Sequence, residues 1–478
     1  MSSLQLQRQN YRAVGKGGQR FLLHVPTTAM YELDKAADSV LALLEETGSV
    51  SEQDVRGRFD GRLSPDEVCD SISDFIALGV VSPEKKDFKN APREIQHSPI
   101  STLVLTLTTG CNLGCTYCYR EDLTTPSKAT VMEESTARRA IDLLLKESTG
   151  HERVNVVFFG GEPTTRFASI RALVPYAEDK AQKLGKVVDF SLTTNASLLT
   201  DEMIGFFEAH RFGISVSMDG DEELHDRYRI TIGGKGTHKL VSKNVGRLLA
   251  GCTSRPVGAR VTLSGGNTDV ARIYRHLHDK LGFAEVGFAP ATASNDSPLG
   301  LDGAEMRTVI NAMKALGREY TEAAKQGVRH GFSNMNQMMQ DLYSGTRKTV
   351  PCGAGIGLLA VGAEGQLALC HRFTGTSFST FGDVNAGIAQ KELSAFLTEA
   401  QTMHPACQGC SARSICAGGC YHESYVRHGD AMSPTFSHCD FIREWLDFGI
   451  ECYGEIMLTN PGFFTPNTTA RVPHGAEQ

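Results

Sequence analysis

Apolar and polar residues follow two periods along the chain, and the changes between them divide its central part into alternating strands and helices. The alternating or continuous apolar pattern of strands occurs at residues 102–107, 154–159, 187–193, 213–218, 259–263 and 285–288. Apolar residues at helical spacing occur at residues 135–147, 167–184, 201–210 and 270–281. Alternating strands and helices give parallel strands with crossover connections, so the pattern predicts an α/β domain over residues 100–340.

The N-terminal residues 1–90 have a different pattern, with two strand-like runs before three helix-like stretches. The strands are expected at residues 21–25 and 30–33. Asp34 is placed to cap the first helix, residues 49–52 have the form of a capping box for the second, and residues 64–67 form a stronger one with proline at the first helical position. This order predicts a small module, followed by a charged, proline-containing linker at residues 85–99.

Length and composition limit the class of protein. At 478 residues, the chain is long enough for about three domains of ~150 residues each. Its hydrophobic content of 41% is sufficient for packed cores, and no apolar run reaches the ~18 residues of a membrane span. The net charge is −7 and no basic tract suggests a nucleic-acid partner. The first residues lack an apolar secretory segment, so we expect a cytoplasmic protein without membrane association.

Cysteine is the most informative residue type. Ten of the 13 cysteines fall in two groups, and in a cytosolic chain such grouping favours metal over disulfides. Cys111, Cys115 and Cys118 form the first group, in a loop directly after the first central strand. Three thiolates on so short a loop can hold three corners of a [4Fe–4S] cube and leave the fourth iron open. A zinc site is the alternative, but it would need a fourth ligand close by, and none is close.

This loop, with Tyr117 before its third cysteine, resembles that of the radical S-adenosylmethionine (radical SAM) superfamily. The resemblance implies a partial (β/α)6 barrel whose open iron chelates S-adenosylmethionine, and whose reduced cluster cleaves it to a radical that abstracts hydrogen. In such barrels the chemistry lies at the C-terminal ends of the strands. The second strand ends there in Gly160, Gly161, Glu162 and Pro163, which resemble the GGEP motif of the family. Its glycines let the backbone approach a ligand, and its carboxylate is expected to meet the amino group of the cofactor.

Three more residues near strand ends resemble cofactor contacts of this family. Asn195 follows the third strand, where it can equally hold the turn, and Ser217 ends the fourth strand as a candidate hydroxyl partner. Arg260 in the fifth strand is expected either to reach the cofactor carboxylate or to form an ion pair at the barrel edge. Residues 221–229 resemble a helix start of the peptide-modifying branch, and we expect their charges to form a solvated face.

The second cysteine group lies in residues 345–452 and resembles the SPASM domain at every spacing. That name covers maturases of subtilosin, pyrroloquinoline quinone, anaerobic sulfatase and mycofactocin. The resemblance implies two auxiliary [4Fe–4S] clusters, and so three in the whole chain, and such a domain should depend on metal to fold. The first auxiliary cluster would be bound by Cys352, Cys370 and Cys420, and the second by Cys407, Cys410, Cys416 and Cys439. A zinc ribbon is the alternative, since it could use one of the cysteine pairs.

The first of these sets departs from the family pattern. Family members with a fully ligated first cluster have another cysteine just upstream of Cys352, and this chain has none. Three alternatives stay open: Cys252 or Cys452 arrives from elsewhere, an oxygen or nitrogen ligand substitutes, or one iron stays open and binds a substrate thiolate. The remaining Cys69 is expected to be a small core residue, and residues 453–478 to be a mobile tail.

The N-terminal module resembles the PqqD-type peptide-recognition domain, a winged-helix-like fold. The resemblance implies that the module binds part of a substrate polypeptide along its third strand, by strand addition. The simpler alternative is that residues 1–90 are a packing extension of the barrel.

The combination of modules predicts a peptide-modifying enzyme. It resembles most the maturases of quinohemoprotein amine dehydrogenase, which share the segment Cys370, His371, Arg372 and Phe373. This resemblance implies thioether bonds from Cys sulfur to a methylene carbon of Asp or Glu in the Cys-rich small subunit, and a reductant such as flavodoxin or ferredoxin. Asp219 and His371 are the candidates for the catalytic base. The alternatives are a sactipeptide-type thioether synthase, a formylglycine-forming sulfatase maturase and, in another class, a non-catalytic iron–sulfur scaffold or electron carrier.

Overall fold

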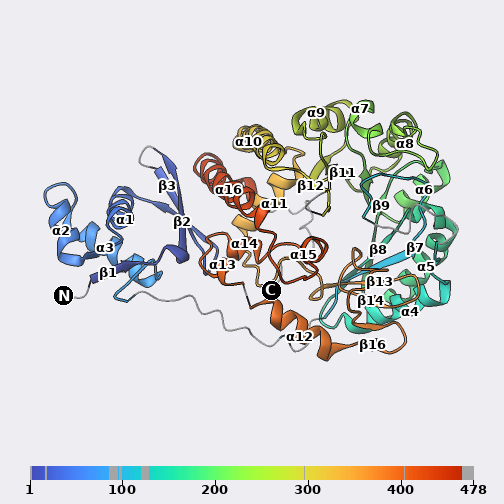
Figure 1. Cartoon of the computed structure of the whole chain (residues 1–478), viewed down its shortest axis with the longest axis horizontal. Helices are drawn as coiled ribbons and strands as arrows, with labels where there is room; N and C mark the ends of the chain where they lie inside the picture. The colour runs from blue at the N-terminus through green and yellow to red at the C-terminus, as the bar shows by residue number, and fades with distance from the viewer. Residues whose placement is uncertain are drawn as a thin grey trace.

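An eight-stranded sheet lies in the right-hand half of the molecule as drawn in Figure 1, in the order β12-β11-β10-β9-β8-β7-β13-β14. The computed structural model describes residues 3–16, 19–84, 95, 99–119, 129–294, 297–402 and 404–465. Six strands are parallel and follow one another in chain order: β7 (Thr102–Thr108), β8 (Arg153–Gly160), β9 (Val187–Thr194), β10 (Gly213–Ser217), β11 (Val257–Leu263) and β12 (Glu285–Pro290). The prediction of an α/β fold with the strand order of a partial (β/α)6 barrel is confirmed.

Helices cover the outer face of this sheet (Figure 1). They are α4 (Glu134–Glu147), α5 (Phe167–Lys183), α6 (Asp201–Ala209), α7 (Glu222–Asp226), α8 (His238–Gly251) and α9 (Val270–Tyr274). In β8, β10 and β11 alternate residues are buried under these helices, and the residues between them face the interior of the barrel, whereas β7 is buried almost throughout. The sequence pattern did not predict α8, and the helix expected at 270–281 changes at Arg275–Lys280 to a π-helical turn.

The C-terminal part of the chain extends the barrel sheet instead of forming a sheet of its own. Strand β13 (Leu358–Val361) pairs in parallel with β7, and β14 (Leu367–Ala368) pairs antiparallel with β13. A small hairpin and seven helices complete this part: β15 (Gly382–Asp383), β16 (Gly387–Ile388), α10 (Gly303–Lys325), α11 (Ser333–Tyr343), α12 (Gln390–Ala400), α13 (Pro405–Gln408), α14 (Arg413–Cys416), α15 (Tyr421–His428) and α16 (Cys439–Thr459). The second cysteine group is therefore connected through β13 to β7, the strand that leads into the first cysteine loop.

The start of the predicted tail belongs to packed structure. Helix α16 continues to Thr459, and Tyr453 and Ile456 on it are buried. Phe463 and Phe464 follow in a short 3-10 helix and pack against the main core. Residues 453–465 are thus wrongly predicted as mobile, while residues 466–478 lie outside the described part of the chain.

The N-terminal module contains two three-stranded sheets, β5-β1-β6 and β2-β3-β4. Its elements are β1 (Ser3–Leu6), β2 (Tyr11–Lys16), β3 (Gln19–His24), β4 (Ala29–Leu33), α1 (Lys35–Thr47), β5 (Ser49–Ser51), α2 (Glu52–Phe59), α3 (Pro65–Ala77) and β6 (Val81–Ser82). Asp34 caps α1 and the capping box of α3 is present, as predicted. The cap of α2 is Ser51 and not Ser49, because Ser49–Ser51 forms β5.

Strand β3 joins this module to the rest of the molecule. Its alternate side chains enter two cores: Leu22 belongs to the small core of the module, whereas Phe21 and Leu23 belong to the main core. Phe21 packs on Gly454 of α16, where an added Cβ would lie 2.2 Å from the ring. The predicted linker lies almost wholly outside the described residues, and Cys69 is half-buried on α3 and not a core residue. None of the described helices combines the length and the apolarity needed to cross a membrane.

Candidate active site

Backbone hydrogen bonds hold the first cysteine loop on the segment that follows α7. The N–H of Gly114 donates to the carbonyl of Ile230 (2.9 Å), and that of Thr116 donates to the carbonyl of Tyr228 (3.0 Å). Cys111 and Cys115 are half-buried and Cys118 is exposed. Burial raises the pKa of Cys111 to about 12, and the nearby Glu162, Cys115 and Cys118 contribute. The three thiols therefore lie near one another on a loop that is fixed from one side and open on the other.

The two glycines of the second motif bring β8 against the start of this loop. Gly160 has φ +148°, and an added Cβ would lie 2.4 Å from the carbonyl oxygen of Thr108, so no larger residue fits. The N–H of Gly161 donates to that same oxygen (2.9 Å), and the N–H of Glu162 donates to Gly110 (3.1 Å). The close approach predicted for these glycines is thus an approach to the neighbouring strand.

The carboxylate of Glu162 is turned inward and is 1% exposed. It accepts hydrogen bonds from the Thr164 hydroxyl (2.6 Å), the Thr194 hydroxyl (2.8 Å), the Thr164 N–H (3.0 Å) and the Asn195 N–H (2.7 Å). Burial raises its pKa, and these donors oppose the shift. The carboxylate ties the ends of β8 and β9 together, and its contact with the amino group of the cofactor stays a prediction.

Asn195 holds the turn after β9 and also reaches the cysteine loop. Its Oδ1 accepts from the N–H (2.9 Å) and the hydroxyl (2.6 Å) of Ser197. Its Nδ2 donates to Asn112 Oδ1 (3.1 Å) and points to the sulfur of Cys111 at 3.8 Å. The turn role left open by the sequence is present, together with a contact to a thiol of the loop.

A buried ion pair supports the loop from behind. Asp219 Oδ2 accepts from Arg229 Nε (2.8 Å) and from the Tyr117 hydroxyl, and Oδ1 accepts from the N–H of Thr262 (2.9 Å). The side chains of Asp219 and Arg229 are 0% and 8% exposed. Burial by itself lowers the pKa of Arg229, but Asp219 and Tyr117 raise it above its usual value. Both oxygens of Asp219 are engaged in this network, which favours a supporting role over that of the base predicted from the sequence.

His225 extends the same network. Its Nδ1 accepts from the N–H of Asp219 (3.4 Å). Its Nε2 donates to Thr237 Oγ1 (3.0 Å), because the hydroxyl of Thr237 already donates its hydrogen to the carbonyl of Arg229 (2.7 Å). Burial, with the positive charge of Arg229, lowers the pKa of His225 to about 2. The prediction that the charges of residues 221–229 form a solvated face is therefore wrong for His225 and Arg229, which are buried beneath the cysteine loop.

Ser217 and Arg260 are register partners on β10 and β11 and belong to the set of strand residues between the buried ones. The Arg260 side chain is open to solvent, but protein atoms surround much of its guanidinium. This partial burial lowers the pKa of Arg260, and the charge of Arg372 lowers it further. The guanidinium lies over Gly287 of β12, where an added Cβ would be 3.2 Å from Nη1. No carboxylate of the described residues forms the ion pair that was considered from the sequence.

Two residues at the end of β11 were missed by sequence reasoning. Ser264 and Asn267 are fully buried, and the hydroxyl of Ser264 and both amide atoms of Asn267 find no hydrogen-bond partner in the described part of the chain. The turn that carries them accepts a hydrogen bond from the hydroxyl of Tyr228, whose carbonyl holds the cysteine loop. These two residues could be found only from the folded chain, in which the turn after β11 contacts Tyr228.

Cysteines of the second group affect the pKa values of other members of the same predicted set, whereas the two clusters themselves stay a prediction. Burial raises the pKa of Cys370 to about 11, with further contributions from Cys420 and Cys352. In the other set the pKa of Cys407 is raised to about 11, by burial and then by its three partners, Cys416, Cys410 and Cys439. Cys352 and Cys420 are exposed.

Cys252 and Cys452 do not complete the first set. Cys252 is buried at the end of α8 against the carbonyl of Ile204 on α6, and Cys452 is fully buried on α16, close to Thr321 of α10. Both pKa values are raised by burial, to about 11 and about 12. The first of the three alternatives drawn from the sequence is therefore wrong.

An aromatic and cationic bridge joins the two cysteine groups. Tyr119, next to Cys118, contacts the ring of His422 at 5.5 Å between centroids, and the guanidinium of Arg372 lies 5.4 Å from the centre of its ring. His422 follows Cys420 and is 3% exposed, and burial together with Arg372 lowers its pKa to about 4. His371, next to Cys370, packs on Phe159 of β8 at 4.4 Å. Residues beside the two cysteine groups thus meet at the C-terminal ends of the barrel strands.

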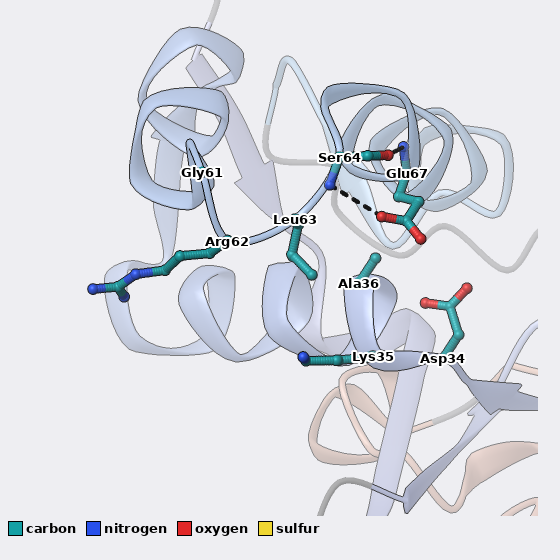
Figure 2. Close-up of a pocket in the computed structure, with 8 residues that line it drawn as sticks. All are labelled: Asp34, Lys35, Ala36, Gly61, Arg62, Leu63, Ser64 and Glu67. Carbon is teal, nitrogen blue, oxygen red and sulfur yellow. Dashed lines mark hydrogen bonds between the residues drawn. The ribbon is translucent and has the colours of Figure 1, made fainter.

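A hollow in the N-terminal module lies between the start of α1 and the loop before α3 (Figure 2). The carboxylates of Asp34 and Glu67 line it, and each caps its own helix: Asp34 accepts from Ala37 N–H (2.8 Å), and Glu67 accepts from Ser64 N–H (3.0 Å). These polar groups are already used by the helix ends, so we assign the hollow a structural role.

Comparison with known families decides the nature of the barrel. Residues 105–272 match the model of the Radical SAM superfamily. A radical SAM domain occupies this part of the chain. The superfamily implies a [4Fe–4S] cluster and S-adenosylmethionine.

The residues present fit these groups. The three thiols of the cysteine loop lie together at the strand ends, and Ser264 and Asn267 provide unpartnered buried polar atoms on the same rim. No three His, Cys, Asp or Glu side chains of the described residues are arranged around a single metal ion. A [4Fe–4S] cube does not require that arrangement, since each thiolate binds a different iron.

Curated relatives of the radical SAM domain include sulfatase-maturating enzymes. The serine-type anaerobic enzyme of Bacteroides thetaiotaomicron is 30% identical over 153 residues, 31% of this chain and 36% of that protein. The cysteine-type enzyme of Clostridium perfringens is 28% identical over 148 residues, 30% of this chain and 40% of that protein. The chain thus spans about two fifths of the length of these relatives. The serine-type enzyme of Klebsiella aerogenes is 23% identical over 342 residues, 67% of this chain and 80% of that protein.

Solved structures share the fold over more of the chain. Native anSMEcpe with bound AdoMet and Cp18Cys peptide has a TM-score of 0.62 at 19% identity and covers 75% of this chain and 99% of that one. Streptococcus suis SuiB bound to precursor peptide SuiA has a TM-score of 0.51 at 13% identity and covers 91% of this chain and 99% of that one.

Proposed function

We propose that this protein is a radical SAM maturase that forms thioether crosslinks in a substrate polypeptide, from Cys sulfur to a methylene carbon of Asp or Glu. The observation that carries the proposal is the N-terminal module. A sulfatase-maturase structure covers 75% of the chain, whereas SuiB with its precursor peptide covers 91%. A module beyond the catalytic barrel suits an enzyme that holds a long polypeptide during the reaction.

The outer edge of β4, the third strand of the sheet β2-β3-β4, is the proposed docking position for the substrate polypeptide, since β3 is paired on both sides. In the β2-β3-β4 sheet this edge pairs with no other strand of the described chain, and Tyr31 and Glu32 on it are exposed. A free edge offers a row of main-chain donors and acceptors to an added strand, with side chains giving selectivity. Part of the Cys-rich substrate would bind there while its reacting residues enter the barrel.

The proposed crosslink removes two hydrogens from the substrate: a hydrogen atom from carbon, a proton from the thiol, and one electron. When bound, the SAM cluster and S-adenosylmethionine supply the radical that takes the hydrogen atom, and auxiliary clusters on the seven cysteines of the second group would receive the electron. A reductant such as flavodoxin or ferredoxin would supply electrons to the SAM cluster. Of the two predicted bases, His371 is the better candidate, because it follows Cys370 and packs on Phe159 near the end of β8, whereas Asp219 is engaged with Arg229.

The small subunit of quinohemoprotein amine dehydrogenase is the proposed substrate, on the resemblance carried by residues 370–373. A second candidate function is formylglycine formation, which the curated relatives of the radical SAM domain favour. Both reactions oxidise a side chain by two electrons, but only the crosslink consumes a thiol while keeping its sulfur.

Intact-mass analysis would distinguish these functions. The reconstituted, reduced protein is incubated anaerobically with S-adenosylmethionine and the small Cys-rich polypeptide, and thiols are then alkylated. Thioether formation gives a loss of two hydrogens per crosslink and one fewer alkylated thiol. An aldehyde would support formylglycine formation instead. Unchanged mass with continued release of 5′-deoxyadenosine would exclude this substrate. The variant in which Cys111, Cys115 and Cys118 are replaced by Ala is the inactive control.

Strand addition would be tested separately by hydrogen exchange. Binding of the polypeptide should slow amide exchange in β4 and leave α2, on the far side of the module, unchanged. Equal exchange with and without substrate would contradict docking at this edge.

A further inference from the structure

Two arginines at the barrel mouth have no carboxylate partner among the residues that the structure describes. Arg260 projects from β11 over Gly287 of β12. Arg372 lies beyond the end of β12, where its Nη1 donates to the hydroxyl of Thr292 (2.5 Å). Gly287 lies within β12 and Thr292 lies two residues beyond its C-terminal end, so both cations contact the same short segment of the chain.

The surroundings fix Arg372 without neutralising it. The Tyr119 ring supports its guanidinium at 5.4 Å, and Thr292 is a neutral acceptor. The nearest acidic group in this chain of contacts is Glu423, which accepts from Thr292 (2.6 Å). That carboxylate already pairs with Arg427 at 2.7 Å, with both side chains about one-tenth exposed. Within the described residues, Arg372 forms no ion pair.

Two half-enclosed cations without counter-ions indicate that anions complete the site. Bringing an arginine out of water costs free energy unless a negative group is supplied, and a guanidinium presents parallel donors that match a carboxylate. The reaction proposed above brings two carboxylates to the barrel mouth: that of S-adenosylmethionine and that of the reacting Asp or Glu. Arg260 lies on a strand beside Ser217, among the residues expected to contact the cofactor. Arg372 lies between the two cysteine groups, because it follows Cys370 by two residues and its guanidinium contacts the ring of Tyr119, next to Cys118.

We propose that Arg372 binds the side-chain carboxylate of the reacting residue and so selects an acidic residue as the carbon partner of the crosslink. This inference rests on the proposed thioether-forming function and deepens it, because it names the charge of the residue that the site accepts. The thiol partner requires no such cation. Formylglycine formation at Cys or Ser would leave Arg372 without a ligand.

The test compares Arg372→Gln with the unaltered enzyme on two polypeptides, one with the reacting Asp or Glu and one with the matching amide. The unaltered enzyme should crosslink the acidic polypeptide about 10- to 100-fold faster in kcat/KM, the range of one charge-assisted hydrogen-bonded contact. Arg372→Gln should lose that factor on the acidic polypeptide and no longer distinguish the two. Arg372→Lys should fall between them, because it keeps the charge but loses the planar fork.

Three controls separate the sources of carboxylate. Equilibrium binding of S-adenosylmethionine should stay unchanged in Arg372→Gln and weaken in Arg260→Gln. Iron content should match the unaltered enzyme, which shows that Cys370 still holds its cluster. Arg307→Gln, on the outer surface in an ion pair with Glu444, should leave every measurement unchanged.

If Arg372→Gln binds S-adenosylmethionine more weakly and slows both polypeptides equally, Arg372 binds the carboxylate of the cofactor and the inference is overturned. Retained discrimination in that variant would place acid recognition elsewhere. If the unaltered enzyme cleaves S-adenosylmethionine but crosslinks neither polypeptide, the proposed function itself fails, and that outcome is visible before any variant is made.

Discussion

Replacing Arg229 by Gln is the perturbation that most directly tests how the cysteine loop is supported. The change leaves the carboxylate of Asp219, which is 0% exposed, without its cation. Tyr117 and the N–H of Thr262 would remain as donors to it. Removing one partner of a buried ion pair costs about 3–5 kcal/mol, because an uncompensated charge is left in a poorly solvated place. We expect a loss of this size in the local stability of the cysteine loop and of the segment around Arg229.

A surface ion pair nearby provides the matched control. Arg272 pairs with Asp221 at 2.6 Å, and their side chains are 41% and 25% exposed. Exposed pairs of this kind are worth about 0–1 kcal/mol, since water solvates both charges when the pair is broken. Arg272→Gln removes the same functional group from the same region of the fold and should have a small effect.

Hydrogen exchange measured by mass spectrometry on peptides that cover residues 110–119 and 213–231 reports the local opening free energy. In Arg229→Gln these peptides should exchange about two to four orders of magnitude faster than in Arg272→Gln, as the cost above implies. The double variant Asp219→Asn with Arg229→Gln should recover part of the loss, since the two residues are in contact. Equal exchange in Arg229→Gln and Arg272→Gln would refute the assignment of the ion pair as the main support of the loop.

Three other predictions concern separate parts of the site. Gly160→Ala places a methyl group against the Thr108 carbonyl and should lower thermal stability and iron retention, whereas Gly205→Ala, in the open interior of α6, should be neutral or stabilising by up to about 1 kcal/mol in the same melting assay. Cys352→Ser should lower the iron content of the reconstituted protein, measured by colorimetric iron analysis, and Cys252→Ser should leave it unchanged. His225 has its pKa lowered to about 2 in the folded state, so stability should fall as the pH drops below the unfolded value of ~6.5, by about 1–1.5 kcal/mol between pH ~7.5 and ~5.5. Melting of wild type and His225→Gln at the two pH values should show this difference, and equal acid sensitivity would contradict it.

Motifs that lie within one short stretch could be read from the sequence together with their surroundings. The cysteine loop follows a strand end because the apolar run at residues 102–107 stops just before Cys111. The glycines at 160 and 161 follow the next strand for the same reason, and parallel strands bring both motifs to one edge of the sheet. Residues whose role depends on a single local turn, such as Asp34 and Ser64, could also be predicted.

Contacts between distant segments could not be predicted. Tyr117 meets Asp219 across 102 residues of sequence, and Arg372 meets Thr292 across 80. The inward turn of Glu162 depends on donors from β9, and the burial of Cys452 depends on α16 packing against α10. In each case the sequence pattern shows a polar or reactive side chain, and only its neighbours in space determine whether that side chain faces a ligand or supports the fold.

The sequence by itself determined the order of the modules, the α/β class and the first cysteine loop, because hydrophobic period and short spacings are properties of neighbouring residues. Only the folded chain shows that β13 joins the barrel sheet and that Cys252 and Cys452 lie in the core away from the second cysteine group. It also shows that, among the described residues, the two arginines at the barrel mouth have no carboxylate partner. The physical reason is that burial and charge pairing depend on distances in space, and residues far apart in the chain acquire these distances only when the chain folds.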